Sequence, residues 1–327
     1  MPNIITHILF ARDMKDRVEE SLRTRIENNQ QLFEIGSNGP DFCFFYGTDP
    51  RKHEEKLPIS KIGTDMHKGN VNDFYRSCLE SIRAQKDEQI KEDMTVYVWG
   101  HLCHWALDST THPYVMYRTG DTNVGNASWW HHRFESCLDA ILLKLKTGLT
   151  TKDFKAKEIC DVSKEKARAI CRIYIPFIHN VFGIQEVKAH HLYQSLQDWY
   201  FIQNVLYDAK GMKHKVVSNI EKVFGVEHAL SGLLVPHEPI DDYDILNLNH
   251  DTWLHPADAS IVSTDSMLDL FDQALNKAEN VIRLFNKALE NPKFETDLFN
   301  YIGDRNYNLN MDQMAPMVNF DLIQDRM

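Results

Sequence analysis

Apolar side chains recur at three- and four-residue intervals along most of this chain, which places them on one face of an α-helix. Alternating patterns typical of half-buried strands are scarce. We therefore predict an all-α fold, a multi-helix bundle. The segments with helical spacing are residues 19–32, 71–85, 94–108, 130–145, 164–182, 187–206 and 266–289, and turn-forming residues mark loops at 36–40, 120–128 and 236–251.

The chain is long enough to bury a large core, and no flexible or low-complexity linker divides its 327 residues. We expect a single domain over residues 1–327. Its histidine-rich part lies in residues 1–140, and an accessory helical region follows in about 150–327.

The formal net charge is −11, and an acidic surface repels nucleic-acid backbones and anionic lipids. Long nucleic acids are therefore not expected as partners. No stretch approaches the roughly 20 apolar residues of a transmembrane helix, and residues 1–14 lack the pattern of a secretory signal. The six cysteines form no Cys-x-x-Cys pair, which favours reduced thiols and a cytoplasmic location.

Two histidine–carboxylate pairs give the strongest chemical signal. His104 and Asp108 are four residues apart, so a helix would turn both toward a single cation. His112 lies one turn further along the same face. Because Pro113 disfavours helical geometry at the residue before it, we expect the helix to end there and His112 to turn toward a second ion.

The second pair is His131 and Glu135, with the same spacing, whereas His132 points about 100° away. Imidazole and carboxylate ligands suit zinc, with manganese and iron as lesser candidates. One such pair is more often structural than metal-binding, but two pairs so close together favour a multinuclear site. His101, three residues before His104, is more typical of a core histidine.

Five segments follow one another in a distinctive order. They are Thr6-His7, Gly36-Ser37-Asn38-Gly39-Pro40-Asp41, Met66-His67-Lys68-Gly69, Gly100-His101-x-x-His104-x-x-x-Asp108-x-x-x-His112-Pro113 and His131-x-x-x-Glu135. In this order they resemble the bacterial zinc-dependent phospholipase C family, which is related in fold to the single-strand-specific zinc nucleases. The later segment 247–253 also resembles cytoplasmic members of the family, without a chemistry known for it.

The resemblance implies a helical fold that holds two or three zinc ions. It assigns Asp41, His67, His104 and Asp108 to one zinc, His112, His131 and Glu135 to a second, and His7 with the bridging carboxylate of Asp108 to a third. In secreted members the first residue left by cleavage completes the third site. Here residue 2 is proline and no signal is visible, so we expect that site to be altered or empty.

Two further differences from the secreted members concern spacing and length. The interval between Asp108 and His112 is shorter here, which affects the second zinc site. The chain also shows no β-rich carboxyl-terminal extension of the kind that docks some family toxins on membranes.

The resemblance implies hydrolysis of a phosphate ester, specifically a phosphodiester of the phospholipase C type, by zinc-activated water. Asp41 is the candidate general base, since a loop carboxylate can bind metal through one oxygen and contact water through the other. The expected substrate is a phospholipid headgroup or a small soluble phosphodiester. Two alternatives stay open: a nuclease or nucleotidase with the same cluster, and a metal-binding scaffold without turnover. The oligomeric state is also left open.

Overall fold

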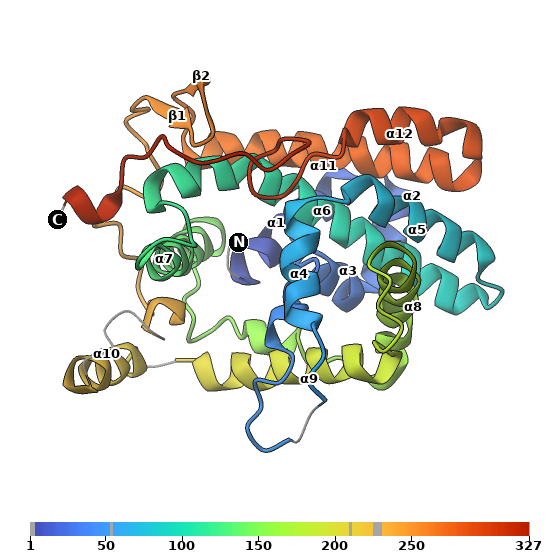
Figure 1. Ribbon diagram of the computed structural model, residues 1–327, viewed down its shortest axis with the longest axis horizontal. Coiled ribbons are helices and arrows are strands. Elements are labelled where there is room, and N and C mark those ends of the chain that lie inside the picture. Colours follow the sequence, from blue (N-terminus) through green and yellow to red (C-terminus); the bar gives the residue numbers. More distant parts are fainter. Residues whose placement is uncertain (1–3, 53–54, 209–210, 225–230, 327) are drawn as a thin grey trace.

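The computed structural model describes residues 4–52, 55–208, 211–224 and 231–326. Helices dominate them, so the predicted all-α class is confirmed (Figure 1). The α-helices are α1 (Ile4–Arg17), α2 (Glu20–Asn28), α3 (Gln30–Gly36), α4 (Ile59–Lys68), α5 (Val71–Ala84), α6 (Glu88–Thr119), α7 (Ala127–Thr147), α8 (Lys164–Val181), α9 (Ala189–Leu206), α10 (Lys213–Phe224), α11 (Met267–Glu290) and α12 (Glu295–Ile302). Among the described residues, no helix is both long enough and apolar enough to cross a membrane.

The long helix α6 is the element around which the others pack. Every residue from Asp93 to Ser109 is buried, which is the pattern of a helix covered on all sides. Its neighbours include α3, α11, α8, α7 and α1. Figure 1 shows α11 running beside α6, with α7 and α8 toward opposite ends of the molecule. Any side chain that α6 turns toward α1, α3 and α7 therefore points into the interior.

The predicted end of this helix near His112 is wrong, because α6 continues through Pro113 to Thr119. A proline inside a helix removes one N–H donor and crowds the carbonyl four residues before it. Here the surrounding residues are almost all buried, and tertiary packing holds the helical geometry despite that cost. His112 consequently stays on the same face as His104 and Asp108.

Most of the predicted helices are confirmed within a few residues, and Ser266 caps α11 by accepting a hydrogen bond from the Asp269 N–H. The helix predicted over 19–32 is two helices, α2 and α3, which meet at Asn29, where the backbone leaves helical geometry. The periodicity does not reveal α1, because every residue from Ile4 to Ala11 is buried and no polar face remains.

The region after α10 is less helical than predicted. The predicted loop at 236–251 is confirmed, and an antiparallel hairpin follows it, formed by β1 (Trp253–His255) and β2 (Asp258–Ser263). Beyond α12 the chain runs without helix from Gly303 to Leu322. Backbone hydrogen bonds attach this C-terminal segment to α4, to the hairpin and to α6, through Tyr307, Val318 and Asp321.

Helices α3 and α6 cross where two glycines face each other. A Cβ on Gly100 would overlap the Phe33 carbonyl oxygen, and a Cβ on Gly36 would overlap the Tyr97 carbonyl oxygen. The crossing therefore requires glycine on both helices. It brings the loop that follows α3 directly over the middle of α6.

We expect Gly100→Ala to lower the free energy of unfolding by about 1–3 kcal/mol, because the added methyl group must push the two backbones apart. Gly69→Ala is the matched control, since its Cβ would meet nothing within 4 Å and its φ of 169° is ordinary extended backbone. Urea unfolding of both variants measures the difference. Equal stability of the two variants would contradict the close crossing.

Candidate metal centre

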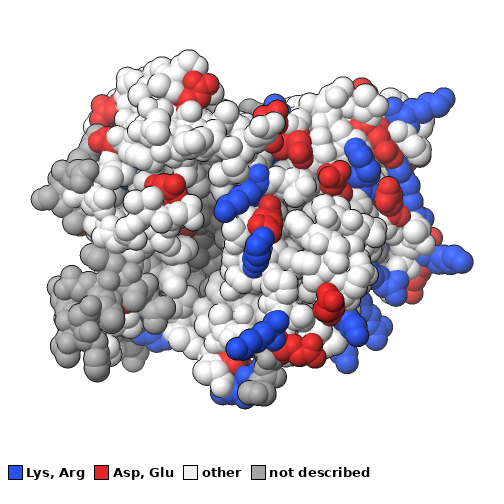
Figure 2. Space-filling model, viewed as in Figure 1, with Lys and Arg blue, Asp and Glu red and all other residues white. Residues whose placement is uncertain are grey.

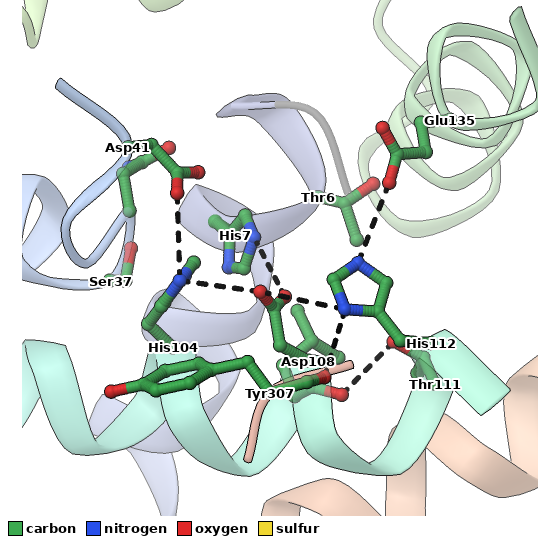
Figure 3. A network of polar contacts seen from close by, with 12 residues as sticks. Thr6, His7, Ser37, Asp41, His104, Asp108, Thr111, His112, Glu135 and Tyr307 are labelled. Carbon is green, nitrogen blue, oxygen red and sulfur yellow. Dashed lines mark hydrogen bonds and ion pairs between the residues drawn. The ribbon is translucent and has the colours of Figure 1, made fainter. Parts of the chain in front are cut away.

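Helix α6 places three of the predicted ligands on successive turns of one face. His104, Asp108 and His112 are four residues apart, and the side chains of all three are 0% exposed. The Nε2 of His104 lies 3.3 Å from Oδ2 of Asp108, and the Nδ1 of His112 lies 3.9 Å from the same oxygen. Figure 3 shows this row of side chains along one side of the helix.

Three more predicted ligands come from other parts of the chain. His7 lies on α1, and Asp41 is the first residue of the short 3-10 helix η1 (Asp41–Phe45). His67 is the second-last residue of α4. The remaining two, His131 and Glu135, lie one turn apart on α7. The structure brings all eight predicted ligands together in three buried groups, each with ligand atoms within 4.8 Å of one another.

The first group is Asp41, His67 and His104. Oδ1 of Asp41 lies 3.2 Å from Nε2 of His67 and 3.7 Å from Nε2 of His104. The second group is His112, His131 and Glu135, in which Oε1 of Glu135 lies 3.6 Å and 2.9 Å from the two Nε2 atoms.

The third group is His7, His104 and Asp108. The two oxygens of Asp108 face different imidazoles: Oδ1 lies 3.3 Å from Nε2 of His7, and Oδ2 lies 3.3 Å from Nε2 of His104 (Figure 3). His104 thus belongs to two groups, and Asp108 lies between the imidazoles of His7 and His104. Pro2, which the sequence comparison connects with the third site, lies outside the described residues.

The spacing of these atoms fits a bound zinc ion. Ligands at about 2.0–2.1 Å from a tetrahedral zinc are about 3.3 Å from one another. The Nε2 atoms of His7, His67, His104 and His112 are buried, yet none makes a hydrogen bond within the described structure. Buried polar atoms normally have partners. A cation between the imidazoles and the carboxylate of each group would supply the missing partner of all four nitrogens.

Hydrogen bonds at the other ring nitrogen orient the imidazoles. A carbonyl oxygen can only accept, so Nδ1 of His67 donates to Gly63 O at 2.7 Å, and Nδ1 of His112 donates to Tyr307 O at 2.9 Å. Nδ1 of His131 faces the Thr119 hydroxyl at 3.3 Å, and that hydroxyl donates to a carbonyl. Each ring is therefore left with a lone pair on Nε2, the tautomer that a metal requires.

Burial also favours the neutral form of the imidazoles, which is the form that binds a metal. It lowers the pKa of His67 and His131 to about 4, so both rings are neutral at pH 7. Burial alone would raise the pKa of Asp108, but the facing imidazoles, His104 foremost, hold it below its ordinary value. Burial and the negative charge of Asp108 raise the pKa of Asp41 well above its ordinary value. Neutral imidazoles beside carboxylates are the donor set for a divalent cation.

A cavity of about 550 Å³ opens onto the first and second groups. The metal-group side chains on its wall are Asp41, His67, His112, His131 and Glu135. The rest of the lining combines apolar with uncharged polar side chains: Ile4, Asn38, Phe44, Phe45, Thr64, Met116, Thr122, Asn123, Ser128, Trp199, Gln203, Leu233, Asn308, Met314 and Met317, together with Lys68 and His132. Such a cavity has room for a small molecule with apolar and polar parts.

A family model described as zinc dependent phospholipase C matches residues 6–234, which is more than half of the chain. The chain belongs to the zinc-dependent phospholipase C family. The predicted family is therefore confirmed, and the matched span contains every residue of the three buried groups. No curated protein and no solved structure matches the chain.

The other singled-out histidines lie outside the three groups. His101 faces the Tyr75 hydroxyl at 3.0 Å through Nδ1 and packs on Phe74, as expected of a core histidine. His132 is 45% exposed and only approaches Glu135, at 3.8 Å. The segment 247–253 has a structural role: the amide of Asn247 bonds to backbone groups of Asp251 and Asp265.

Tyr307 is a site residue that sequence reasoning missed, and it lies beyond the part matched by the zinc-dependent phospholipase C model. Its carbonyl oxygen orients His112, and its N–H donates to the carbonyl oxygen of His67 at 3.1 Å. Its ring packs against the rings of His67 and His104 at 5.1 and 5.4 Å. Because two of these contacts use backbone atoms, no residue pattern could have indicated them.

Asp139 is a second residue that was missed, although a signal exists. It continues the four-residue spacing of His131 and Glu135 along α7. Its carboxylate accepts hydrogen bonds from the N–H groups of Ile5 and Thr6, at 3.1 and 2.8 Å, and from the Thr6 hydroxyl. It therefore fixes the start of α1, and with it the direction of the neighbouring His7.

The loop before Asp41 requires glycine at position 39. It has a φ of +51°, and a Cβ there would overlap the ring of His104. The backbone of the loop thus lies directly on one metal-group imidazole while it delivers Asp41 to the same group.

We expect His104→Asn to remove more bound zinc per chain than His131→Asn, because His104 belongs to two groups and His131 to one. Elemental analysis after exhaustive dialysis measures the difference. His132→Asn, at the exposed neighbouring position, is the control and should retain the wild-type content. Equal losses from the first two variants would argue against a shared ligand.

The pH dependence of folding offers a test of Asp139. Burial raises the pKa of its carboxyl to about 7. Since the folded state binds this proton more tightly than the unfolded chain does, ionisation of Asp139 costs stability as pH rises from about 4 to about 7. The free energy of unfolding of Asp139→Asn should therefore rise relative to wild type across this window. Urea unfolding at pH 5 and pH 7.5 checks it, and a constant difference would refute it.

Proposed function

We propose that this protein is a zinc-dependent phosphodiesterase of the phospholipase C type, acting on a phospholipid or a small phosphodiester. The observation that carries the proposal is the meeting of three buried imidazole–carboxylate groups, two of which share His104, beside a cavity. Family membership supports the same reaction class.

In this proposal the zinc ions, two or three in number, are held by the eight residues of the three groups, with Asp108 as the bridging carboxylate. When bound, zinc would make water available as a nucleophile near neutral pH and offset negative charge on the phosphate oxygens. The distances and ring tautomers given above support this assignment.

Asp41 is the proposed general base. Its Oδ1 faces the imidazoles of His67 and His104, which leaves Oδ2 to accept a proton from the attacking water. Asp41 is 8% exposed and lines the cavity, through which substrate and water would reach it. Phe44 and Phe45, which follow on the same 3-10 helix, limit the access of other water molecules.

We also propose that residues 1–327 act as one domain in the cytoplasm. A single cluster of buried apolar residues extends from Ile4 to Ile323, which supports one domain. All six cysteines are buried free thiols, which supports a reducing compartment.

A panel of chromogenic esters tests the proposed reaction. We expect the zinc-loaded protein to cleave a phosphocholine ester or a bis-phosphodiester, and a chelator to abolish the cleavage. Preference for a phosphomonoester would favour a nucleotidase. Activity on none of the esters with zinc bound would favour a scaffold and contradict the proposal.

Asp41→Asn should reduce kcat by about 10²–10⁴-fold, the usual contribution of a general base, while much of the zinc remains bound. Asp65→Asn, a partly exposed carboxylate paired with Lys61 on α4, is the control and should keep full activity. Unchanged turnover in Asp41→Asn would exclude the role of Asp41.

A further inference from the structure

The cavity contains polar side chains that the three metal groups do not use. Lys68, Thr122, Ser128, Gln203 and Asn308 line it, and among the described residues none of these side chains has a hydrogen bond or an ion pair. They come from α4, the loop between α6 and α7, the start of α7, α9 and the C-terminal segment. Unpartnered donors and acceptors from separate elements around one cavity indicate a polar ligand group.

Lys68 gives this set its charge. It directly follows His67 and is the one lysine or arginine among the described residues of the cavity wall. Lys61, two turns earlier on the same helix, is neutralised by Asp65, whereas Lys68 has no such partner among the described residues. Figure 2 shows basic side chains with an acidic one between them over α4 beside a hollow, and the described surface across from them is mostly uncharged.

A cationic headgroup has little to bind in this cavity. The two carboxylates on the described wall, Asp41 and Glu135, face imidazoles within the metal groups. One face of each aromatic ring on the wall also has a ring partner: Phe44 stacks on His67 at 5.4 Å between ring centres.

The other two aromatic side chains of the wall, Phe45 and Trp199, stack on each other at 6.4 Å. A quaternary ammonium group needs open aromatic faces or a free carboxylate, and Lys68 would repel it.

We propose that this cavity selects phosphodiesters with a hydroxyl-rich, uncharged headgroup, a polyol such as glycerol, and that Lys68 with Thr122, Ser128, Gln203 and Asn308 binds the hydroxyl groups. Five hydrogen-bonding side chains can pair with the several hydroxyls of a polyol, and none of them can pair with a trimethylammonium group. This inference rests on the proposed function, because it assigns the headgroup of the same reaction.

The test compares two short-chain lipids with the same acyl groups, dihexanoyl-phosphatidylglycerol and dihexanoyl-phosphatidylcholine, on the zinc-loaded full chain. We expect kcat/KM to be higher for the glycerol lipid. Lys68→Gln should lower kcat/KM for that lipid by about tenfold, through KM, the size expected for a lost hydrogen bond to a charged donor. It should not lower kcat/KM for the choline lipid, because Lys68 only repels that headgroup.

Lys61→Gln is the matched control and should change neither lipid, and zinc content should be equal in all three proteins. Equal losses on both lipids from Lys68→Gln would mean that Lys68 contacts the scissile phosphate, which overturns the headgroup assignment. A wild-type preference for the choline lipid also overturns it.

A third substrate, bis-(p-nitrophenyl) phosphate, distinguishes a failure of the headgroup assignment from a failure of the proposed function. Cleavage of this ester without cleavage of the glycerol lipid overturns the headgroup assignment alone. Failure on all three substrates with zinc bound overturns the proposed function and the headgroup assignment together.

Discussion

The buried charge of Asp108 is the interaction on which the centre depends. A carboxylate that is 0% exposed is strongly destabilising unless cations or donors surround it. Here α1 and α6 turn imidazoles toward its two oxygens. The groups built on Asp41 and Glu135 repeat the arrangement on either side. The fold can be understood as the set of helix contacts that holds these three acids and their imidazoles in one interior.

The continuity of α6 determines how the groups are spaced. Because the helix continues through Pro113, His104, Asp108 and His112 follow one another at intervals of about 6 Å rise, four residues at about 1.5 Å each. A helix that ended at His112 would have let the second group drift away from the first. The close crossing of α3 at Gly36 then places the Asp41 loop on the same helix. The four-residue spacing on α6 and the close crossing of α3 and α6 thus hold the three groups in one compact centre.

Sequence reasoning reached different parts of this site by different routes. The four-residue spacing alone identified His104, Asp108, His131 and Glu135, because helix geometry fixes which residues share a face. His7, Asp41 and His67 came only from the family resemblance, since separate elements position them. Helix α1 escaped detection because its first eight residues are buried on all sides. Pro113 misled the prediction because local preference yields to packing in a buried helix.

The contribution of Tyr307 has a consequence for how the protein is made. The residues that carry the imidazoles and acids are all synthesised before residue 136, but the carbonyl that orients His112 belongs to residue 307. A growing chain therefore presents these side chains on the ribosome well before their last positioning contact exists. Stable capture of metal should follow the synthesis of the C-terminal segment, and premature termination before it would leave an incomplete centre.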